Sequence, residues 1–249
     1  MIFRQLYEPV SSTYTYLFGC EKSGQAVLLD PVVNSIDRDL AELSKLGLTL
    51  AYTLETHIHA DHITSALQLR EKTGCKIAAP AIDCLPCTDV GIEDGTSFEF
   101  GSISLEPIHT PGHTDGHFAY RLDDRVFTGD ALLIEGCGRT DFQNGDIESL
   151  YRSVQERLFS LPDDYLVYPA HDYQKRRVST IAQEKDRNER LGNGKTLEEF
   201  RSIMQELNLP YPKFIDYAVP GNRQCGACPS DLPEHLREYC RKMEQSPQG

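Results

Sequence analysis

The chain has 249 residues, of which 39% are hydrophobic and 25% are charged, and its formal net charge at pH 7 is −13. These values are typical of a globular protein that forms one large domain or a domain with an appendage. The acidic balance argues against a nucleic-acid partner, because phosphate binding needs a basic face. Because no apolar run approaches the ~20 residues of a membrane span and no signal or transit pattern is visible, we expect a cytoplasmic protein without membrane contact.

The first part of the chain alternates strand and helix patterns. Apolar and β-branched runs predict strands over 13–18, 26–29 and 48–54, and helical periodicity predicts helices over 34–46 and 64–72. Asn34 is expected to cap the first of these helices. Gly47 and Gly74 are expected to end the two helices, because glycine readily adopts the left-handed conformation at a helix C-terminus.

The second part begins with a run of strand patterns. We expect strands over 97–108, 118–122, 126–128 and 166–167, with turns at Gly101 and at 123–124. A helix is expected to open at Asp146, and residues 174–191 are expected to be largely helical. Thr196 and Glu199 have the spacing of a capping box that starts a helix reaching about residue 207.

The character of the chain changes after Tyr173. Aliphatic residues become sparse, and prolines follow at positions 210, 212, 220 and 229. We therefore interpret residues 1–175 as a catalytic core and residues 176–249 as a helical and irregular appendage packed on it.

Seven residues have the side chains of metal ligands: His57, His59, Asp61, His62, His113, Asp130 and His171. They include five of the eight histidines in the chain. Histidine and carboxylate ligands suit zinc or iron without any thiolate. The first four follow a predicted strand directly, and the carboxyl ends of such strands are where ligands gather in α/β sheets. The pattern therefore predicts a transition-metal site.

Residue types alone leave the number of metals open. With two metals, His57, His59 and His113 would form one site, Asp61, His62 and His171 would form the other, and Asp130 would bridge them. Such a pair would generate a hydroxide for hydrolysis. With one metal, two histidines and one carboxylate would leave positions open, as in Fe(II) oxygenases.

Four segments resemble the motifs of the metallo-β-lactamase superfamily. They are TLETHIHADH (53–62), TPGHTDGH (110–117), FTGDALL (127–133) and YPAHDY (168–173), in the order typical of that superfamily. The resemblance implies an α/β fold, an αββα sandwich with the metal at one edge between two mixed sheets, here followed by the short C-terminal appendage.

Further segments resemble the ETHE1-type persulfide dioxygenases. These are THIHADHITS (56–65), GCGRTDFQNG (136–145) and PGNRQCG (220–226). The resemblance implies one Fe(II) per chain, held by the residues matching His57, His113 and Asp130. It gives His59, Asp61, His62 and His171 the task of orienting the ligands and holding water.

The same resemblance implies the reactants. The substrates would be glutathione persulfide and O₂, oxidised to sulfite with release of glutathione, and Arg139 and Tyr173 would line the substrate pocket. An alternative for Arg139 is a structural pair with Asp141 in its own loop. A homodimer is usual for the family, and a separate sulfurtransferase of the rhodanese type could supply the persulfide. The preferred thiol persulfide is left open.

Two other functions are considered. One is a dinuclear hydrolase of glutathione thioesters, of the glyoxalase II type, which metal content would distinguish from the dioxygenase. The other is a non-catalytic sulfur carrier that uses Cys225 or Cys137.

The eight cysteines are scattered along the chain. Two CxxC pairs, 84–87 and 225–228, could together bind a structural zinc, but the gap between them is far from the usual spacing. We expect most of the cysteines to be free or buried thiols, and none to be a catalytic nucleophile.

Overall fold

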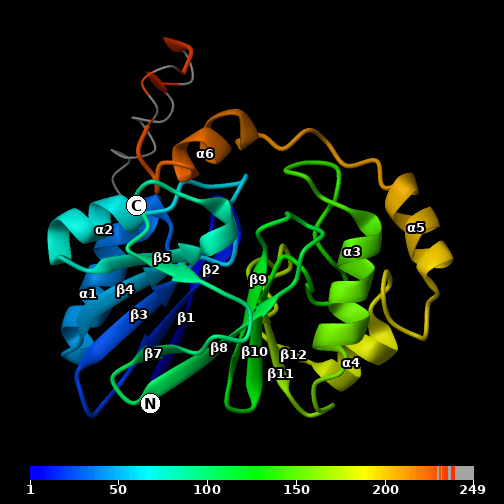
Figure 1. The fold of residues 1–249 in the computed structure, drawn as a ribbon, viewed down its shortest axis with the longest axis horizontal. Coiled ribbons are helices and arrows are strands. Elements are labelled where there is room, and N and C mark those ends of the chain that lie inside the picture. The colour runs from blue at the N-terminus through cyan, green and yellow to red at the C-terminus, as the bar shows by residue number, and fades with distance from the viewer. Residues whose placement is uncertain (229, 231, 235–236, 239–249) are drawn as a thin grey trace. The chain divides into compact units, whose positions relative to one another are not determined.

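The computed structural model describes residues 1–228, 230, 232–234 and 237–238. The chain forms two compact units, whose elements are labelled in Figure 1. The first contains residues 1–92, 99–103 and the described residues from 211 onward, and the second contains residues 93–98 and 104–210. The described part of the chain has no helix long and apolar enough to cross a membrane.

The first unit is built on a mixed six-stranded sheet with the order β1-β2-β3-β4-β5-β6. Its strands are β1 (Ile2–Glu8), β2 (Thr13–Gly19), β3 (Gln25–Leu29), β4 (Thr49–Leu54), β5 (Lys76–Pro80) and β6 (Val90–Ile92). β1 to β3 pair antiparallel, and β3 to β6 pair parallel. The parallel pairs need crossover connections, which α1 (Ile36–Leu46) and α2 (Ala66–Thr73) supply.

The second sheet also has six strands, in the order β12-β11-β10-β9-β8-β7. They are β7 (Phe98–Phe100), β8 (Ile103–His109), β9 (Phe118–Leu122), β10 (Arg125–Gly129), β11 (Leu166–Pro169) and β12 (Ser179–Thr180). β10 and β11 run parallel, and the helix between them is α3 (Ile147–Arg152), which continues as a π-helix over Ser153–Leu158. The unit also contains α4 (Ile181–Arg187) and α5 (Leu197–Glu206).

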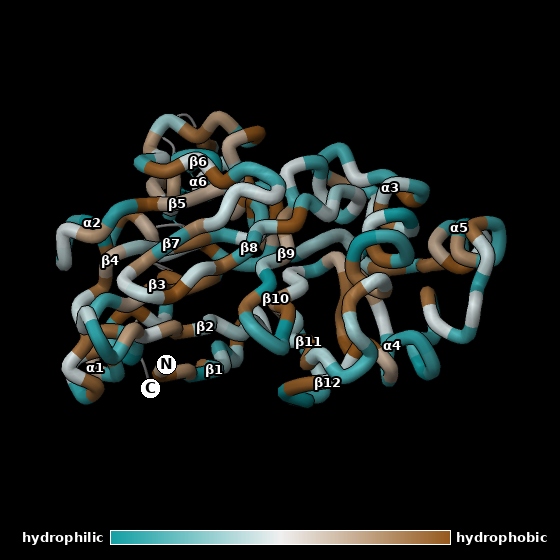
Figure 2. The backbone as a smooth tube through the Cα atoms, turned by 60° about the horizontal axis from the view of Figure 1, so that its bottom comes forward, coloured by the Kyte–Doolittle hydropathy of each residue, from teal (hydrophilic) through white to brown (hydrophobic). Residues whose placement is uncertain are grey.

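Each unit has its own apolar core. In the first, Leu28 of β3, Leu43 of α1 and Leu69 of α2 belong to one buried cluster. In the second, Val126 of β10 and Phe200 of α5 belong to another. Figure 2 shows the colour of α1 and α5 switching between hydrophilic and hydrophobic along each helix, as expected for helices that bury one face.

Several local predictions are confirmed. Gly47 and Gly74 end α1 and α2 in the left-handed conformation, with φ of 65° and 75°. Asp146 caps α3 by accepting a hydrogen bond from the Ser149 N–H. Thr196 and Glu199 form the expected capping box of α5.

Other local predictions are wrong. Asn34 is not the cap of α1, because it lies in a 3₁₀ turn that precedes the helix. The segment 174–191 is helical only over Ile181–Arg187, and β12 adds a strand after the one expected to be last. The proline-rich region contains helix α6 (Ile215–Asn222), which buries Tyr217 and Ala218 in the core of the first unit, so this region contributes more to the core than its composition indicated.

The predicted division into a core over 1–175 and an appendage over 176–249 packed on it stays a prediction. In the structure, residues 176–210 belong to the second compact unit, and the described residues from 211 onward belong to the first.

Candidate metal centre

The first unit presents its histidines on the loop that follows β4. His57, His59 and His62 are each no more than 2% exposed. The ring centroid of His59 lies 4.1 Å from that of His57 and 4.3 Å from that of His62, so the sequence cluster is also a cluster in space.

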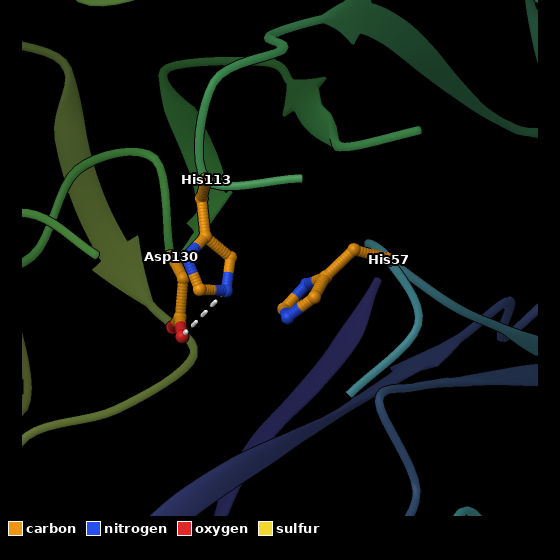
Figure 3. A group of neighbouring side chains, drawn as sticks. All are labelled: His57, His113 and Asp130. Carbon is orange, nitrogen blue, oxygen red and sulfur yellow. Dashed lines mark ion pairs between the residues drawn. The ribbon is translucent and has the colours of Figure 1, made fainter. Parts of the chain in front are cut away.

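The tautomer of His57 follows from its neighbours. Thr56 Oγ1 donates to Asp30 Oδ2 at 3.0 Å, so it accepts from His57 Nδ1, which lies 2.8 Å away. The Nδ1 of His57 then carries the hydrogen, and Nε2 keeps a lone pair for a metal. Figure 3 draws His57 on its loop.

His59 is held by two buried carboxylates. Its Nε2 lies 3.1 Å from Asp30 Oδ1 and 3.6 Å from Glu55 Oε2. Burial alone would lower the pKa of His59, but the charge of Asp30 and its hydrogen bond outweigh this and raise it. Burial raises the pKa of the Glu55 carboxyl. His59 therefore serves as the centre of a buried charge network, which satisfies groups that would be costly to bury alone.

Asp30 and Glu55 were not among the residues predicted for the site. Asp30 directly follows β3 and Glu55 directly follows β4, and the last residues of these strands, Leu29 and Leu54, are partners in the parallel pair. Two acidic residues at the carboxyl ends of adjacent parallel strands were therefore a usable signal.

Asp61 and His62 form a further part of this loop. His62 Nδ1 lies 3.0 Å from Asp61 Oδ2 and 3.3 Å from Thr13 Oγ1. One ligand atom from each of His59, Asp61 and His62 lies within 4.8 Å of the others, a spacing that could hold a cation. The second metal of the hydrolase alternative would need Asp61 and His62 among its ligands.

The second unit brings His113, Asp130 and His171 together from three separate segments. His171 Nδ1 lies 2.7 Å from Asp130 Oδ1, and His113 Nε2 lies 3.6 Å from Asp130 Oδ2, the ion pair drawn in Figure 3. His113 Nδ1 lies 2.7 Å from the Arg139 carbonyl oxygen, which can only accept. In a neutral His113 the Nδ1 carries the hydrogen, so a nitrogen lone pair faces a carboxylate oxygen, and this donor set fits a metal cation.

His117 fixes the backbone at Asp130. It is fully buried, and its Nε2 accepts a hydrogen bond from the Asp130 N–H at 3.0 Å. Its Nδ1 then carries the hydrogen and donates to Thr110 Oγ1 at 2.8 Å. The Asp130 carbonyl accepts from the Gly138 N–H at 2.7 Å. A Cβ at Gly138 would lie 2.7 Å from His113 Nδ1, so only glycine fits this close approach.

Arg139 occupies a loop of the second unit. Its guanidinium pairs with both carboxylate oxygens of Asp141 at 2.6 Å, donates to the Pro210 carbonyl at 2.8 Å and lies 4.7 Å from the centroid of the Phe142 ring. It also lines a cavity of about 560 Å³. The structural pair with Asp141 is therefore present, and substrate binding by Arg139 stays a prediction.

Tyr173 follows the last histidine of the set. Its side chain is 76% exposed, and its ring stacks on His171 with 6.4 Å between the centroids. The ring is accessible to a substrate, and its role there stays a prediction.

The structure corrects the expectation for two cysteines. Cys87, in the loop before β6, forms a disulfide with Cys225, just after α6, so neither is a free thiol. Cys84 is free and exposed, which leaves the two CxxC pairs without the four thiolates of a zinc site. Cys137 is buried, and burial raises the pKa of its thiol to about 11. It is therefore a thiol rather than a nucleophilic thiolate near neutral pH.

Comparisons with known proteins agree with this geometry. The profile described as "Metallo-beta-lactamase superfamily" matches residues 9–171. A protein of Homo sapiens named "Persulfide dioxygenase ETHE1, mitochondrial" is 49% identical over 91% of this chain and 89% of its own length. The crystal structure of ETHE1 from Myxococcus xanthus has 52% identity and a TM-score of 0.89, and covers 91% of this chain and 100% of that one.

The hydroxyacylglutathione hydrolases match less of the chain. The hydroxyacylglutathione hydrolase of Methylococcus capsulatus is 38% identical, but over only 66% of this chain and 64% of its own. The predicted fold class, two mixed sheets with helices as in the metallo-β-lactamase α/β sandwich, is confirmed. The chain therefore belongs to the metallo-β-lactamase superfamily and, within it, to the ETHE1 group.

Proposed function

We propose that this protein is an iron-dependent persulfide dioxygenase. In this reaction glutathione persulfide, O₂ and water give glutathione and sulfite, and the terminal sulfur is oxidised while O₂ is reduced. The observation that carries the proposal is the extent of the similarity. The relatives named persulfide dioxygenase match 91% of this chain, whereas hydroxyacylglutathione hydrolases of three bacteria match 66–70%. The dioxygenase similarity therefore extends well beyond the motifs that both groups share.

The proposed metal ligands are His57, His113 and Asp130. Two imidazoles and one carboxylate form the ligand set typical of non-haem Fe(II) oxygenases. Iron bound there would supply the redox chemistry that O₂ needs. The tautomers inferred above support the choice, because both His57 and His113 keep Nε2 available.

The remaining residues of the set would orient these ligands. His171 binds one oxygen of Asp130, which leaves Oδ2 for the metal. His59 is committed to Asp30 and Glu55, and His62 to Asp61. Such partners fix ring orientation and hydrogen position, and they tune the affinity of a metal site.

Substrate binding is assigned to Arg139 and Tyr173. Glutathione carries two carboxylates, and a guanidinium matches a carboxylate with two parallel hydrogen bonds. Because Asp141 already occupies this face of Arg139, a substrate carboxylate would either displace Asp141 or use the edge that faces Pro210. A homodimer, a cytoplasmic location and a sulfurtransferase donor of the rhodanese type are further parts of the proposal.

The competing proposal is a dinuclear thioester hydrolase, supported by the spacing of His59, Asp61 and His62 and by the similarity to hydroxyacylglutathione hydrolases. The test is turnover by anaerobically purified, iron-loaded protein, with glutathione persulfide and a glutathione thioester as parallel substrates. We expect one sulfite formed per O₂ consumed and negligible thioester hydrolysis. Efficient thioester hydrolysis without O₂ uptake would replace the dioxygenase proposal by the hydrolase.

A further inference from the structure

The segment that follows α6 lies against the backbone of the histidine loop of the same unit. Asn222, the last residue of α6, is only 4% exposed. Its Nδ2 donates to the carbonyl oxygens of His59 and His62, each at 2.8 Å. Its Oδ1 accepts from the Thr64 N–H at 2.9 Å. One buried amide thus binds three backbone groups of the loop.

These bonds hold the part of the loop that is farther from β4, between His59 and Thr64. The start of the loop is fixed by Thr56, whose N–H donates to Asp30 Oδ1 at 2.7 Å. The far end, from His59 to Thr64, departs from regular structure before α2 begins. Since the loop carbonyls bound by Asn222 are buried, losing this partner would leave them unsatisfied, which is costly.

The residues after Asn222 keep it in place. The Cys225 carbonyl accepts from the Leu67 N–H at 3.1 Å, and the Gly226 carbonyl accepts from Gln68 Nε2 at 3.2 Å. A Cβ at Gly226 would lie 2.1 Å from the Thr64 carbonyl oxygen, so the two backbones touch. The Cys87–Cys225 disulfide adds a covalent tie to the same segment.

We propose that Asn222 is a positioning residue for the metal centre. Through the backbone of His59 and His62 it holds the loop that carries His57 in the geometry that binds metal. It contacts no substrate, so its loss should affect metal retention and turnover number more than the KM for the persulfide. The turnover readout of this inference rests on the proposed function. The other readouts, metal retention and the spectrum of the metal site, require only that the site binds metal.

The test compares Asn222→Asp and Asn222→Ser with a control, Phe214→Leu. Asn222→Asp is nearly isosteric and can still accept from Thr64, but it cannot donate to the two carbonyls. The serine variant is a milder change that guards against misfolding of the aspartate variant. Phe214 is a buried residue of the core of the first unit and lies directly before α6, so its truncation loosens the helix without touching the amide bonds.

Three readouts decide the outcome: metal retained during dialysis against a chelator, the visible spectrum of the Co(II)-substituted protein, and kcat with KM after iron loading. For Asn222→Asp we expect about 10–100-fold weaker metal retention. We also expect an altered Co(II) spectrum, and a lower kcat at a KM within about twofold. Phe214→Leu should lower the melting temperature and leave the Co(II) spectrum unchanged.

Two results would overturn the inference. One is wild-type metal retention and Co(II) spectrum in both Asn222 variants. The other is an equal loss of metal in Phe214→Leu at an equal drop in melting temperature, since that would make the role of Asn222 one of general stability. A wild-type protein that binds metal but consumes no O₂ would refute the proposed function, while the metal readouts would still decide this inference.

Discussion

The two regions that carry the candidate ligands are built in opposite ways. In the first unit, four ligand-type residues lie within positions 57–62, and their loop is fastened by Asn222, 158 positions from Thr64. In the second unit, the ligand-type residues His113, Asp130 and His171 are far apart in the sequence. The backbone N–H of Asp130, however, donates to His117, which is only 13 positions away. The loop of the compact motif is therefore held in part by a distant residue, Asn222, and Asp130 is held in part by a nearer one, His117.

The largest effect should come from removing a ligand in either region. His57→Ala and His113→Ala should each lose nearly all iron and abolish O₂ uptake, because both regions are proposed to share one metal. The measurement is iron per chain together with O₂ consumption. If one variant keeps full iron and activity, the shared site is wrong.

Removing the disulfide that ties the segment after α6 to the loop before β6 should lower the stability of the protein. Removal of the Cys87–Cys225 disulfide by Cys87→Ser should lower the free energy of unfolding by about 2–4 kcal/mol, because the bond constrains a long loop in the unfolded chain. Denaturant titration with and without a reducing agent measures this loss. The wild type and the variant should have equal stability once both are reduced, and a difference that persists would contradict the account.

The variant Arg139→Ala distinguishes a role in substrate binding from a role in metal binding. Arg139→Ala should keep its iron and raise the KM for glutathione persulfide, with a loss of about 1.5–3 kcal/mol for a charged hydrogen bond. Asp141→Asn, which removes the charge but keeps the residue size, is the matched control for loop disruption. Wild-type kinetics in a folded, iron-loaded Arg139→Ala variant would refute the assignment.

The local support of the second region can be tested through His117. His117→Gln keeps an acceptor near the position of Nε2, whereas His117→Phe removes it and leaves the buried Asp130 N–H without its bond. We expect the phenylalanine variant to bind iron about 10–100-fold more weakly and the glutamine variant to recover part of that loss. Equal affinities for the two variants would mean that the hydrogen bond to Asp130 does not matter.

The smallest effect is expected for Cys137. Because burial raises the pKa of this thiol to about 11, it is protonated near neutral pH and is not needed as a nucleophile. Cys137→Ser should keep turnover within about twofold at matched iron content, since it exchanges one atom of a thiol that is not a nucleophile. Complete loss of turnover with iron and folding intact would place a protein persulfide on the pathway.

Local rules predicted much of the fold. The glycine ends of α1 and α2 and the capping box of α5 depend on neighbouring residues only, and they are confirmed. The loop after β4 was also visible, because its ligands are adjacent in sequence. Helix α6 was missed because it contains Pro220 and follows Pro210 and Pro212, and it is stabilised by the core of the first unit.

The supports of the site were harder to predict. Asn222 is an ordinary amide in the sequence, and its role depends on where α6 docks. The disulfide joins residues 138 positions apart, which spacing alone does not reveal. Asp30 and Glu55 were not predicted as site residues, although the parallel pairing of β3 and β4 makes them neighbours of His59. Contacts between residues that are far apart in the sequence cannot be predicted from local sequence patterns.

The number and identity of the metals test the central claim most directly. Anaerobically purified protein should contain one iron per chain, and Asp130→Ala should contain almost none. Asp61→Ala should keep most of its iron, because Asp61 is proposed to orient His62 rather than to bind metal. Two metals per chain in the wild type, with one of them lost in Asp61→Ala, would contradict the mononuclear iron site.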